Sequence, residues 1–358
     1  MKWHDYRNVC LVLFAWVLAL ANSGHSRTVL KFGIPTNSGP VLMTNSSSRE
    51  GNFCISDDGL ELYVGSDRGG GHGGFDIWVA TRETVSASWG LPVNLGATVN
   101  GWAEDGSPYL TSDGLALYFS SNRPGGQGNA DIWVTTRASV SSPWMTPVNL
   151  GADINTFADE FSPVISADGL ELYFSEYTVP HPSGLGGGDI WVTKRVSVSD
   201  SWGEVENLGP VVNSSLFEAV SSIAPDGLSL LIGSTGRAGG YGVEDMWLTT
   251  RRSRSEPWGT PVNLGPSVNS SGWDAHPVFC WRGSILYFLS SRYGTEGYYD
   301  IWQVSVSAVS SCDLDENGLV DMRDFAIFAE NWLTAEPENV ENWPFSSYPD
   351  YCTGWVGC

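Results

Sequence analysis

Residues 104–151 read EDGSPYLTSDGLALYFSSNRPGGQGNADIWVTTRASVSSPWMTPVNLG, and variants of this stretch occur five times in the 358-residue chain. An Asp-Gly pair, replaced by Arg-Gly in the last copy, begins at Asp58, Asp113, Asp168, Asp226 and Arg282, at intervals of 55, 55, 58 and 56 residues. Asp-Ile-Trp or Asp-Met-Trp keeps the same step, beginning at Asp76, Asp131, Asp189, Asp245 and Asp300. Two independent markers with one period indicate a repeat protein.

Within a copy the apolar residues alternate, which is typical of β-strands. The segment LALYF follows the Asp-Gly turn, DIWVTT is rich in β-branched and aromatic residues, and PVNL ends the copy. Four short strands joined by Gly, Asp and Pro turns make one blade of a β-propeller. The repeats span residues 50–103, 104–158, 159–217, 218–273 and 274–309.

The fifth copy has no Pro-Val-Asn-Leu-Gly strand before it ends at Val309. A matching segment, Ile-Pro-Thr-Asn-Ser-Gly, begins at Ile34, so we expect residues 30–39 to complete the last blade and close the ring. The sequence therefore predicts an all-β propeller over residues 27–309. Five blades are favoured, with six as the alternative if residues 27–49 build more than one strand.

The pattern Ser-x-Asp-Gly-x-x-Leu-Tyr-Phe-Ser-Ser-x-Arg-x-Gly-Gly-x-Gly-x-x-Asp-Ile-Trp resembles the WD-repeat-like propeller repeats of the TolB type. The resemblance covers about residues 50–306. It implies a propeller with a bias toward binding, and it carries over no catalytic residue.

Charge and the N-terminal residues indicate export. The chain has 18 Lys and Arg against 40 Asp and Glu, a net charge of −22, which argues against nucleic acid or anionic lipid as partners. Residues 1–23 combine Lys2 and Arg7 with the apolar run 9–21, as in a signal peptide. We expect a secreted or cell-envelope protein with no membrane insertion after cleavage; the alternative is a retained N-terminal anchor helix.

Several shared positions are expected to be structural. The Trp of each Asp-Ile-Trp should fill the space between blades, and Cys54 and Cys280 are expected to be buried thiols. The Asp of each Asp-Ile-Trp should cap the Gly-rich loop before it. It is also expected to pair with the arginines of that loop, which are Arg68, Arg123, Arg237 and Arg292.

An acidic residue stands eight positions before each turn marker: Glu50, Asp105, Glu160, Glu218 and Asp274. These five residues, called the acidic column below, are expected to begin the innermost strands. They could ring one mouth of the central channel and bind a cation or a polar ligand, or each could bond the backbone of a neighbouring blade. The preceding positions differ between copies and could set selectivity; they hold Arg49, Glu104, Asp159, Phe217 and Trp273.

Residues 310–358 leave the repeat pattern and contain DLDENGLVDMRD, which matches a twelve-residue calcium loop. Gly318 occupies the sharp-turn position. The expected ligands are the side chains of Asp313, Asp315, Asn317, Asp321 and Asp324 and the carbonyl of Leu319.

Asp at position twelve is followed by a helical pattern over residues 325–333. This segment resembles half of a type I dockerin repeat, the calcium-dependent docking module of secreted bacterial assemblies. The resemblance covers about residues 312–334 and implies a small α-helical module with a docking partner. A dockerin carries two such repeats, and residues 334–358 show no second one.

From these features the sequence favours an exported binding or scaffold protein rather than an enzyme. The propeller face would contact a protein or polysaccharide, and the calcium module would act as a tether. The alternative is a secreted glycoside hydrolase or lyase that uses carboxylates at the channel mouth. No catalytic residue is assigned, because the acidic column provides no evident asymmetry, the five histidines are scattered, and no Gly-x-Ser-x-Gly is present.

Overall fold

A computed structural model describes residues 28–38, 48–177, 184–280, 284–295 and 298–310, and all regular elements within these residues are β-strands. This part of the chain holds no helix that could cross a membrane. By their contacts, the described residues fall into two compact units, one made of residues 33–305 and the other of residues 28–32 with 306–310. In the second unit, β1 (Thr28–Phe32) pairs antiparallel with residues 306–310, which end β21 (Asp300–Ser310).

The repeats within residues 33–305 fold as antiparallel sheets of four strands. In repeat one the strands are β3 (Glu50–Ile55), β4 (Glu61–Ser66), β5 (Asp76–Thr81) and β6 (Val93–Asn94). In repeat two they are β7 (Asp105–Leu110), β8 (Ala116–Ser121), β9 (Asp131–Thr136) and β10 (Val148–Asn149). In repeat three they are β11 (Asp159–Ile165), β12 (Glu171–Tyr177), β13 (Gly188–Lys194) and β14 (Glu206–Asn207).

In repeat four the strands are β15 (Phe217–Ile223), β16 (Ser229–Thr235), β17 (Glu244–Thr250) and β18 (Val262–Asn263). Repeat five contains β19 (Asp274–Cys280), β20 (Ile285–Ser290) and the first part of β21. Its fourth strand is β2 (Thr36–Asn37), whose residues pair with Gln303 and Trp302 of β21. The N-terminal segment therefore supplies the fourth strand of repeat five through Thr36 and Asn37.

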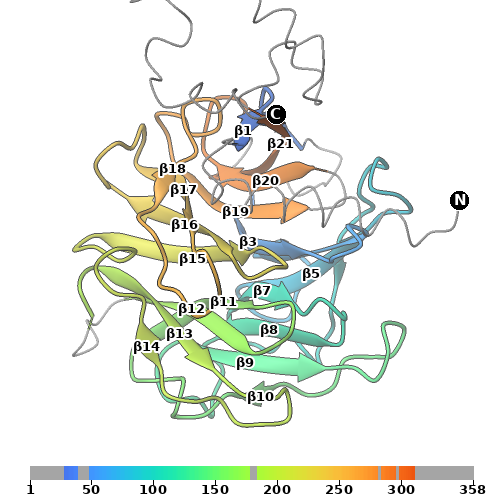
Figure 1. Ribbon diagram of the computed structural model, residues 1–358. Helices are drawn as coiled ribbons and strands as arrows, with labels where there is room; N and C mark the ends of the chain where they lie inside the picture. The colour runs from blue at the N-terminus through green and yellow to red at the C-terminus, as the bar shows by residue number, and fades with distance from the viewer. Residues whose placement is uncertain (1–27, 39–47, 178–183, 281–283, 296–297, 311–358) are drawn as a thin grey trace, which may run out of the picture. The chain divides into compact units, whose positions relative to one another are not determined.

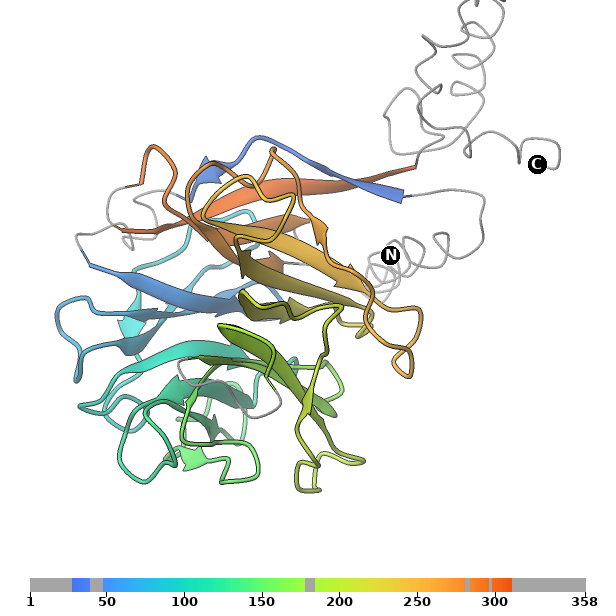
Figure 2. The same ribbon diagram turned by 90° about the vertical axis from the view of Figure 1, so that its left-hand side faces the viewer.

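The first strands of the repeats surround a common centre (Figure 1). β7 contacts β3 and β11, β15 contacts β11 and β19, and β19 contacts β3. The blue strands of repeat one lie beside the orange strands of repeat five in both views (Figures 1 and 2). They share one core cluster, in which Phe53 and Leu62 pack with Val278 and Tyr287.

The Asp-Gly turns join the first and second strands, as in repeat one. The Asp58 carboxylate accepts hydrogen bonds from the Ser56 hydroxyl at 2.6 Å and from the Leu60 amide at 3.0 Å. Gly59 has a φ of 72°, in the left-handed region that favours glycine. Short-range chemistry thus fixes this turn, and the turn sets the register of the two strands.

A buried asparagine in the connection between repeats is a structural feature that the sequence analysis did not single out. Asn155 accepts a hydrogen bond from the Ile132 amide at 2.8 Å, and it donates to the Ile132 carbonyl at 3.1 Å and to Asn149 Oδ1 at 3.0 Å. Asn100, Asn213 and Asn269 make the same contacts in their repeats. The signal was the Asn that follows the Leu-Gly of each copy by four residues.

The repeated tryptophans are buried, as predicted. A second set of tryptophans packs under the arginine that directly follows the third strand of repeats one to four. The Arg137 guanidinium lies 4.4 Å from the Trp144 ring centroid and donates to the Gly114 carbonyl at 2.7 Å. Arg82, Arg195 and Arg251 repeat this arrangement over Trp89, Trp202 and Trp258. Cys54 and Cys280 are both buried, also as predicted.

Candidate functional site

The acidic column lies at the start of the five innermost strands, and every member is buried. Four members accept a hydrogen bond from the backbone amide four residues earlier, in the connection from the preceding repeat. The donors are Gly101 to Asp105, Thr156 to Glu160, Ser214 to Glu218 and Ser270 to Asp274. These bonds favour the alternative in which the column is structural, because each of these carboxylates holds the backbone of the connection from the neighbouring repeat.

In three repeats the carboxylate also forms a hydrogen-bonded ion pair with an arginine. Asp105 lies 2.5 Å from Arg123, Glu218 lies 3.1 Å from Arg237, and Asp274 lies 2.6 Å from Arg292. Each arginine also donates to a backbone carbonyl of the connecting segment, at Val99, Val212 and Val268.

These arginines thus pair with the acidic column and not, as predicted, with the Asp of the Asp-Ile-Trp motif. That Asp does cap the Gly-rich loop, as predicted. Asp131, for example, accepts the backbone amides of Gln127 at 2.6 Å and Gly128 at 2.9 Å. Asp76, Asp189 and Asp245 accept amides in the same way.

Repeat one departs from this pattern. Glu50 and Arg68 lie 3.6 Å apart, and neither oxygen of the Glu50 carboxyl has a hydrogen-bond partner within the described residues. Burial raises the pKa of Glu50 to about 8, against the opposing effect of the nearby Arg68 charge. This carboxyl is therefore held less tightly than those of repeats two, four and five.

Repeat three departs further, because a second carboxyl faces the column. Ser66, Ser121, Ser234 and Ser290 pair directly with the column residue of their own sheets, but in repeat three Glu176 pairs with Glu160. Glu176 in turn pairs with Asp189 on β13, so that three acidic residues follow one another across adjacent strands. Among the described residues no arginine forms an ion pair with Glu160.

The pKa of Glu160 is raised to about 8, chiefly by burial and in part by the Asp131 and Glu176 charges. Thr156 supports one oxygen, with its amide at 3.0 Å and its hydroxyl at 2.5 Å. The other oxygen, Oε2, is buried and has no hydrogen-bond partner in the part of the chain that is described. The acidic column is therefore asymmetric. Two features of the sequence indicate this asymmetry. Repeat three has Glu176 where the other four repeats have a serine, and it lacks the arginine that follows that serine in the other repeats.

Aromatic residues flank the acidic column in repeats two to four. The rings of Phe161 and Phe217 are stacked, with centroids 6.2 Å apart and an interplanar angle of 5°. Tyr177 meets Phe217 edge-on at 5.6 Å and is half exposed. Trp102 and Phe157, three residues before the column residues of repeats two and three, are 75% and 64% exposed. Such exposed rings are typical of a binding surface.

The other residues beside the column differ in environment. Arg49 pairs with Asp67 at 3.0 Å, and Glu104 is exposed. Asp159 accepts the Ala130 amide at 3.1 Å. Trp273 donates its indole N–H to Glu244 at 2.7 Å and packs against the Tyr299 ring at 4.1 Å. Burial raises the pKa of Glu244 to about 7.

A polar network occupies the space among the innermost strands. The Asn52 amide donates to Ser107 Oγ at 3.2 Å and to Ser162 Oγ at 2.7 Å, and so joins three repeats. The His276 ring lies 2.8 Å from the Phe53 carbonyl, and burial lowers its pKa to about 4. Ser107, Ser162 and His276 have positive φ and sit at bulges of their strands.

Within the described residues, no group of three or more His, Cys, Asp and Glu side chains could hold a metal ion. The expected calcium ligands in residues 313–324 lie outside the described residues, as do residues 1–23 and the helical pattern over residues 325–333.

No family model and no curated protein matches the sequence. Among solved structures, a glycoside hydrolase has a TM-score of 0.53, with 10% identity over 86% of this chain and 96% of its own. A thermostable family-43 glycoside hydrolase has a TM-score of 0.50, with 12% identity over 79% of this chain and 95% of its own. The putative TolB of Agrobacterium tumefaciens has a TM-score of 0.43, with 12% identity over 79% and 99%. The chain thus has an all-β, propeller-type fold.

These comparisons correct one prediction. The sequence analysis favoured a protein that is not an enzyme, because it interpreted the propeller as a binding scaffold. In the two structures with the higher TM-scores, the same fold belongs to glycoside hydrolases. The prediction of a non-enzyme is therefore wrong, and the comparisons favour the alternative that was weighed beside it.

Proposed function

We propose that the protein is a glycoside hydrolase and that Glu160 is its general acid. The observation that carries the proposal is the asymmetry of the acidic column. Glycoside cleavage needs one carboxyl that is protonated at neutral pH and a second that is ionised. Glu160, with its pKa raised to about 8, meets the first requirement, and its Oε2 atom makes no hydrogen bond within the described residues.

The second carboxylate would come from a neighbouring innermost strand. Asp105 on β7 and Glu218 on β15 are the candidates, because both strands contact β11 and both side chains form ion pairs with arginine. In this scheme Glu160 protonates the leaving oxygen of the glycosidic bond. The second carboxylate either activates water or attacks the sugar carbon.

Access to Glu160 requires a local movement. The side chain is fully buried, and the segment that carries Thr156 bonds its Oε1 atom. A substrate would therefore have to displace this segment to reach the carboxyl. Phe157, which is exposed next to Thr156, could drive that displacement by packing its ring on the apolar C–H face of a sugar.

A substrate panel tests the proposal. Full-length protein is incubated with neutral and acidic polysaccharides and aryl glycosides, and new reducing ends are measured. We expect hydrolysis that falls as pH rises through about 8, because Glu160 then loses its proton. Glu160→Gln should abolish it, and Glu83→Gln, at an exposed position in the loop after β5, should not. Absence of hydrolysis across the panel, or full activity of Glu160→Gln, would refute the assignment.

The remaining predictions complete the proposed organisation. We propose that the five repeats form the whole ring, with β2 completing the last blade. Residues 1–23 would direct export to the cell envelope or the exterior. Residues 313–324 would bind calcium, and the dockerin-like segment would tether the enzyme to a docking partner. A polysaccharide is then the expected partner of the propeller face.

A further inference from the structure

Two phenylalanines form a parallel pair near the start of the innermost strands of repeats three and four. The rings of Phe161 on β11 and Phe217 on β15 have centroids 6.2 Å apart and an interplanar angle of 5°. Phe161 directly follows Glu160, and Phe217 directly precedes Glu218. Both phenylalanines are half-buried, so part of each residue is open to solvent. The pair therefore lies at the same end of the innermost strands as the acidic column.

Neighbouring residues hold the Phe217 ring in place. Tyr177 meets this ring edge-on, with 5.6 Å between the centroids. Gly188 on β13 pairs with Phe217, and a Cβ atom at Gly188 would lie 2.5 Å from a carbon of the ring. The ring thus lies against the backbone of β13, where glycine leaves room for it. A ring that is fixed before binding loses little conformational entropy when a ligand packs on it.

The packing of the repeats does not require a large side chain at position 161. In the other four repeats the equivalent position holds a glycine or an alanine: Gly51, Gly106, Ala219 and Ala275. Those sheets pack around the common centre with small side chains, so Phe161 serves a purpose that is particular to repeat three. A partly open aromatic ring at a position where the scaffold needs none is typical of a binding surface.

Polar groups next to the pair can bind hydroxyl groups. The Asn52 amide nitrogen donates to Oγ of Ser162, the residue that follows Phe161, at 2.7 Å and to Ser107 Oγ at 3.2 Å. Both bonds use the N–H donors of Asn52, and no donor among the described residues bonds its Oδ1 atom. Asn52 and Ser107 are half-buried. An amide oxygen accepts hydrogen bonds and a serine hydroxyl donates or accepts them, which matches the hydroxyls of a sugar.

The charges at this end of the strands disfavour an acidic ligand. The arginines of the Gly-rich loops each pair with a carboxylate of the acidic column; they are Arg68, Arg123, Arg237 and Arg292. Arg49, which precedes the column residue of repeat one, pairs with Asp67 at 3.0 Å. The whole chain has a net charge of −22. A carboxylate on a sugar would therefore meet like charges, and each of these arginines already has an acidic partner.

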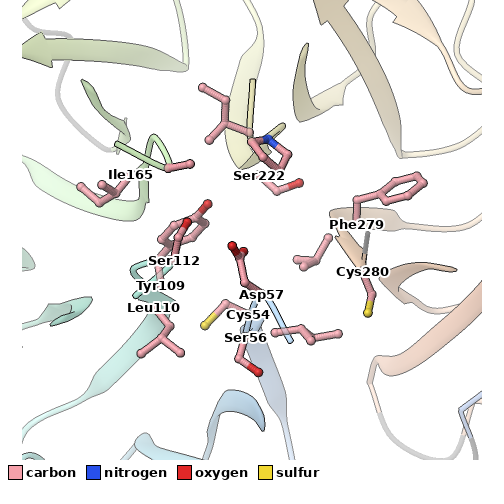
Figure 3. Close-up of a pocket in the computed structure, with 15 residues that line it drawn as sticks. Cys54, Ser56, Asp57, Tyr109, Leu110, Ser112, Ile165, Ser222, Phe279 and Cys280 are labelled. Carbon is pink, nitrogen blue, oxygen red and sulfur yellow. The ribbon is translucent and has the colours of Figure 1, made fainter. Parts of the chain in front are cut away.

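The opposite end of the innermost strands holds a pocket that is too small for a sugar. Its volume is about 40 Å³, and Leu110, Ile165 and Phe279 are among the side chains that line it (Figure 3). That is room for a few water-sized groups and not for a sugar ring. A saccharide that binds at the common centre of the repeats is therefore expected at the end that carries Phe161 and Phe217.

We propose that Phe161 and Phe217 form a stacking subsite for a neutral sugar unit of a polysaccharide. This inference deepens the proposed function and rests on it for the class of ligand. The apolar C–H face of the sugar packs on the rings, and its hydroxyls bond Asn52 and Ser107. Side chains alternate along a strand, so Phe161 and Glu160 lie on opposite faces of β11. The subsite therefore fits a sugar unit next to the one whose bond is cleaved.

Binding is measured with full-length Glu160→Gln protein, so that hydrolysis does not consume the probes. The probes are neutral oligosaccharides of glucose, xylose, galactose and arabinose, with oligogalacturonate and chitosan oligosaccharide as acidic and basic counterparts. Saturation-transfer NMR gives the affinity and shows which sugar protons contact the protein. We expect a neutral oligosaccharide to bind, with the strongest saturation on the C–H protons of one face. A preference for the acidic or the basic probe, or no binding of any neutral probe, would overturn the proposal.

Variants of the same protein decide whether the rings are responsible. Phe161→Ala should weaken binding about tenfold, and Phe161→Tyr, which keeps the ring, should bind as tightly as the unaltered pair. Phe217→Leu is a second test, because leucine keeps an apolar side chain and removes the ring; it should also weaken binding. Leu91→Ala, which removes an exposed apolar side chain beside the outermost strand of repeat one, should change nothing. Urea unfolding verifies that each variant is folded.

The outcomes separate this subsite from the proposed hydrolase activity. If Phe161→Ala and Phe217→Leu bind as tightly as the unaltered pair, the subsite is refuted even where Glu160-dependent hydrolysis is observed. Ring-dependent binding by a protein that hydrolyses no substrate would support the subsite and refute only the proposed activity.

Discussion

Glu160→Gln is expected to make the protein more stable at pH 8, although it alters a fully buried residue. Glutamine has the same shape and keeps an oxygen that can accept the Thr156 hydrogen bonds. It replaces Oε2 with an NH2 group, which removes the ionisable proton and adds N–H donors where Oε2 has no hydrogen-bond partner among the described residues. The pH dependence of the stability change therefore reports on the protonation of Glu160, because the amide does not titrate.

The sign follows from the two pKa values. Below pH about 4.5 the carboxyl is protonated in both the folded and the unfolded chain, so it adds no pH dependence. Between pH 4.5 and about 8 the unfolded chain releases the proton and the folded protein keeps it. The unfolded state then binds fewer protons, and the free energy of unfolding falls as pH rises through this window.

The magnitude comes from the same two values. The pKa rises from 4.5 to about 8, and each pKa unit corresponds to about 1.4 kcal/mol. The ionisable carboxyl thus lowers stability at pH 8 by up to about 5 kcal/mol. Glu160→Gln should recover much of this, and its advantage should vanish near pH 4.5.

Glu218→Gln is the matched control, because Glu218 holds the equivalent position but pairs with Arg237 at 3.1 Å. Its loss leaves a largely buried guanidinium without its carboxylate, which should destabilise the protein by about 3 kcal/mol at pH 8. Both variants are unfolded in urea at pH 5 and pH 8. If Glu160→Gln is no more stable than the original protein at pH 8, the argument for a protonated Glu160 fails.

Three further predictions concern the repeats and the calcium loop. Asn213→Ala removes three hydrogen bonds, two of them buried, and should lower the free energy of unfolding in urea by about 3 kcal/mol; an effect under about 1 kcal/mol would show that this buried asparagine does not hold the connection between repeats. Gly128→Ala would place a Cβ atom 2.7 Å from the Thr156 carbonyl oxygen and should lower the free energy of unfolding by about 2 kcal/mol or more. Gly69→Ala is the control, because a Cβ atom there meets nothing within 4 Å. It should change the free energy of unfolding by less than about 0.5 kcal/mol in the same assay. Asp313→Ala should abolish a calcium-induced gain of helix in circular dichroism, and an unchanged titration would contradict calcium binding by residues 313–324.

The repeat architecture could be predicted because its signals are local. Strand alternation and the Asp-Gly turn act over a few residues, and Asp58, Ser56 and Gly59 make the contacts that such a turn requires. Completion of the last sheet by β2 was also readable, since the missing strand of repeat five reappears near Ile34. The proposed role of Glu160 was missed because the five acidic residues were treated as equivalent.

The sequence by itself determined the period, the all-β class, the buried tryptophans and the position of the acidic column. Only the tertiary structure decided which carboxyls differ. The pKa of Glu160 depends on its burial and on the groups around it, and both follow from the folded sheet. Glu176, 16 residues later in the sequence, faces Glu160 because the two strands pair antiparallel.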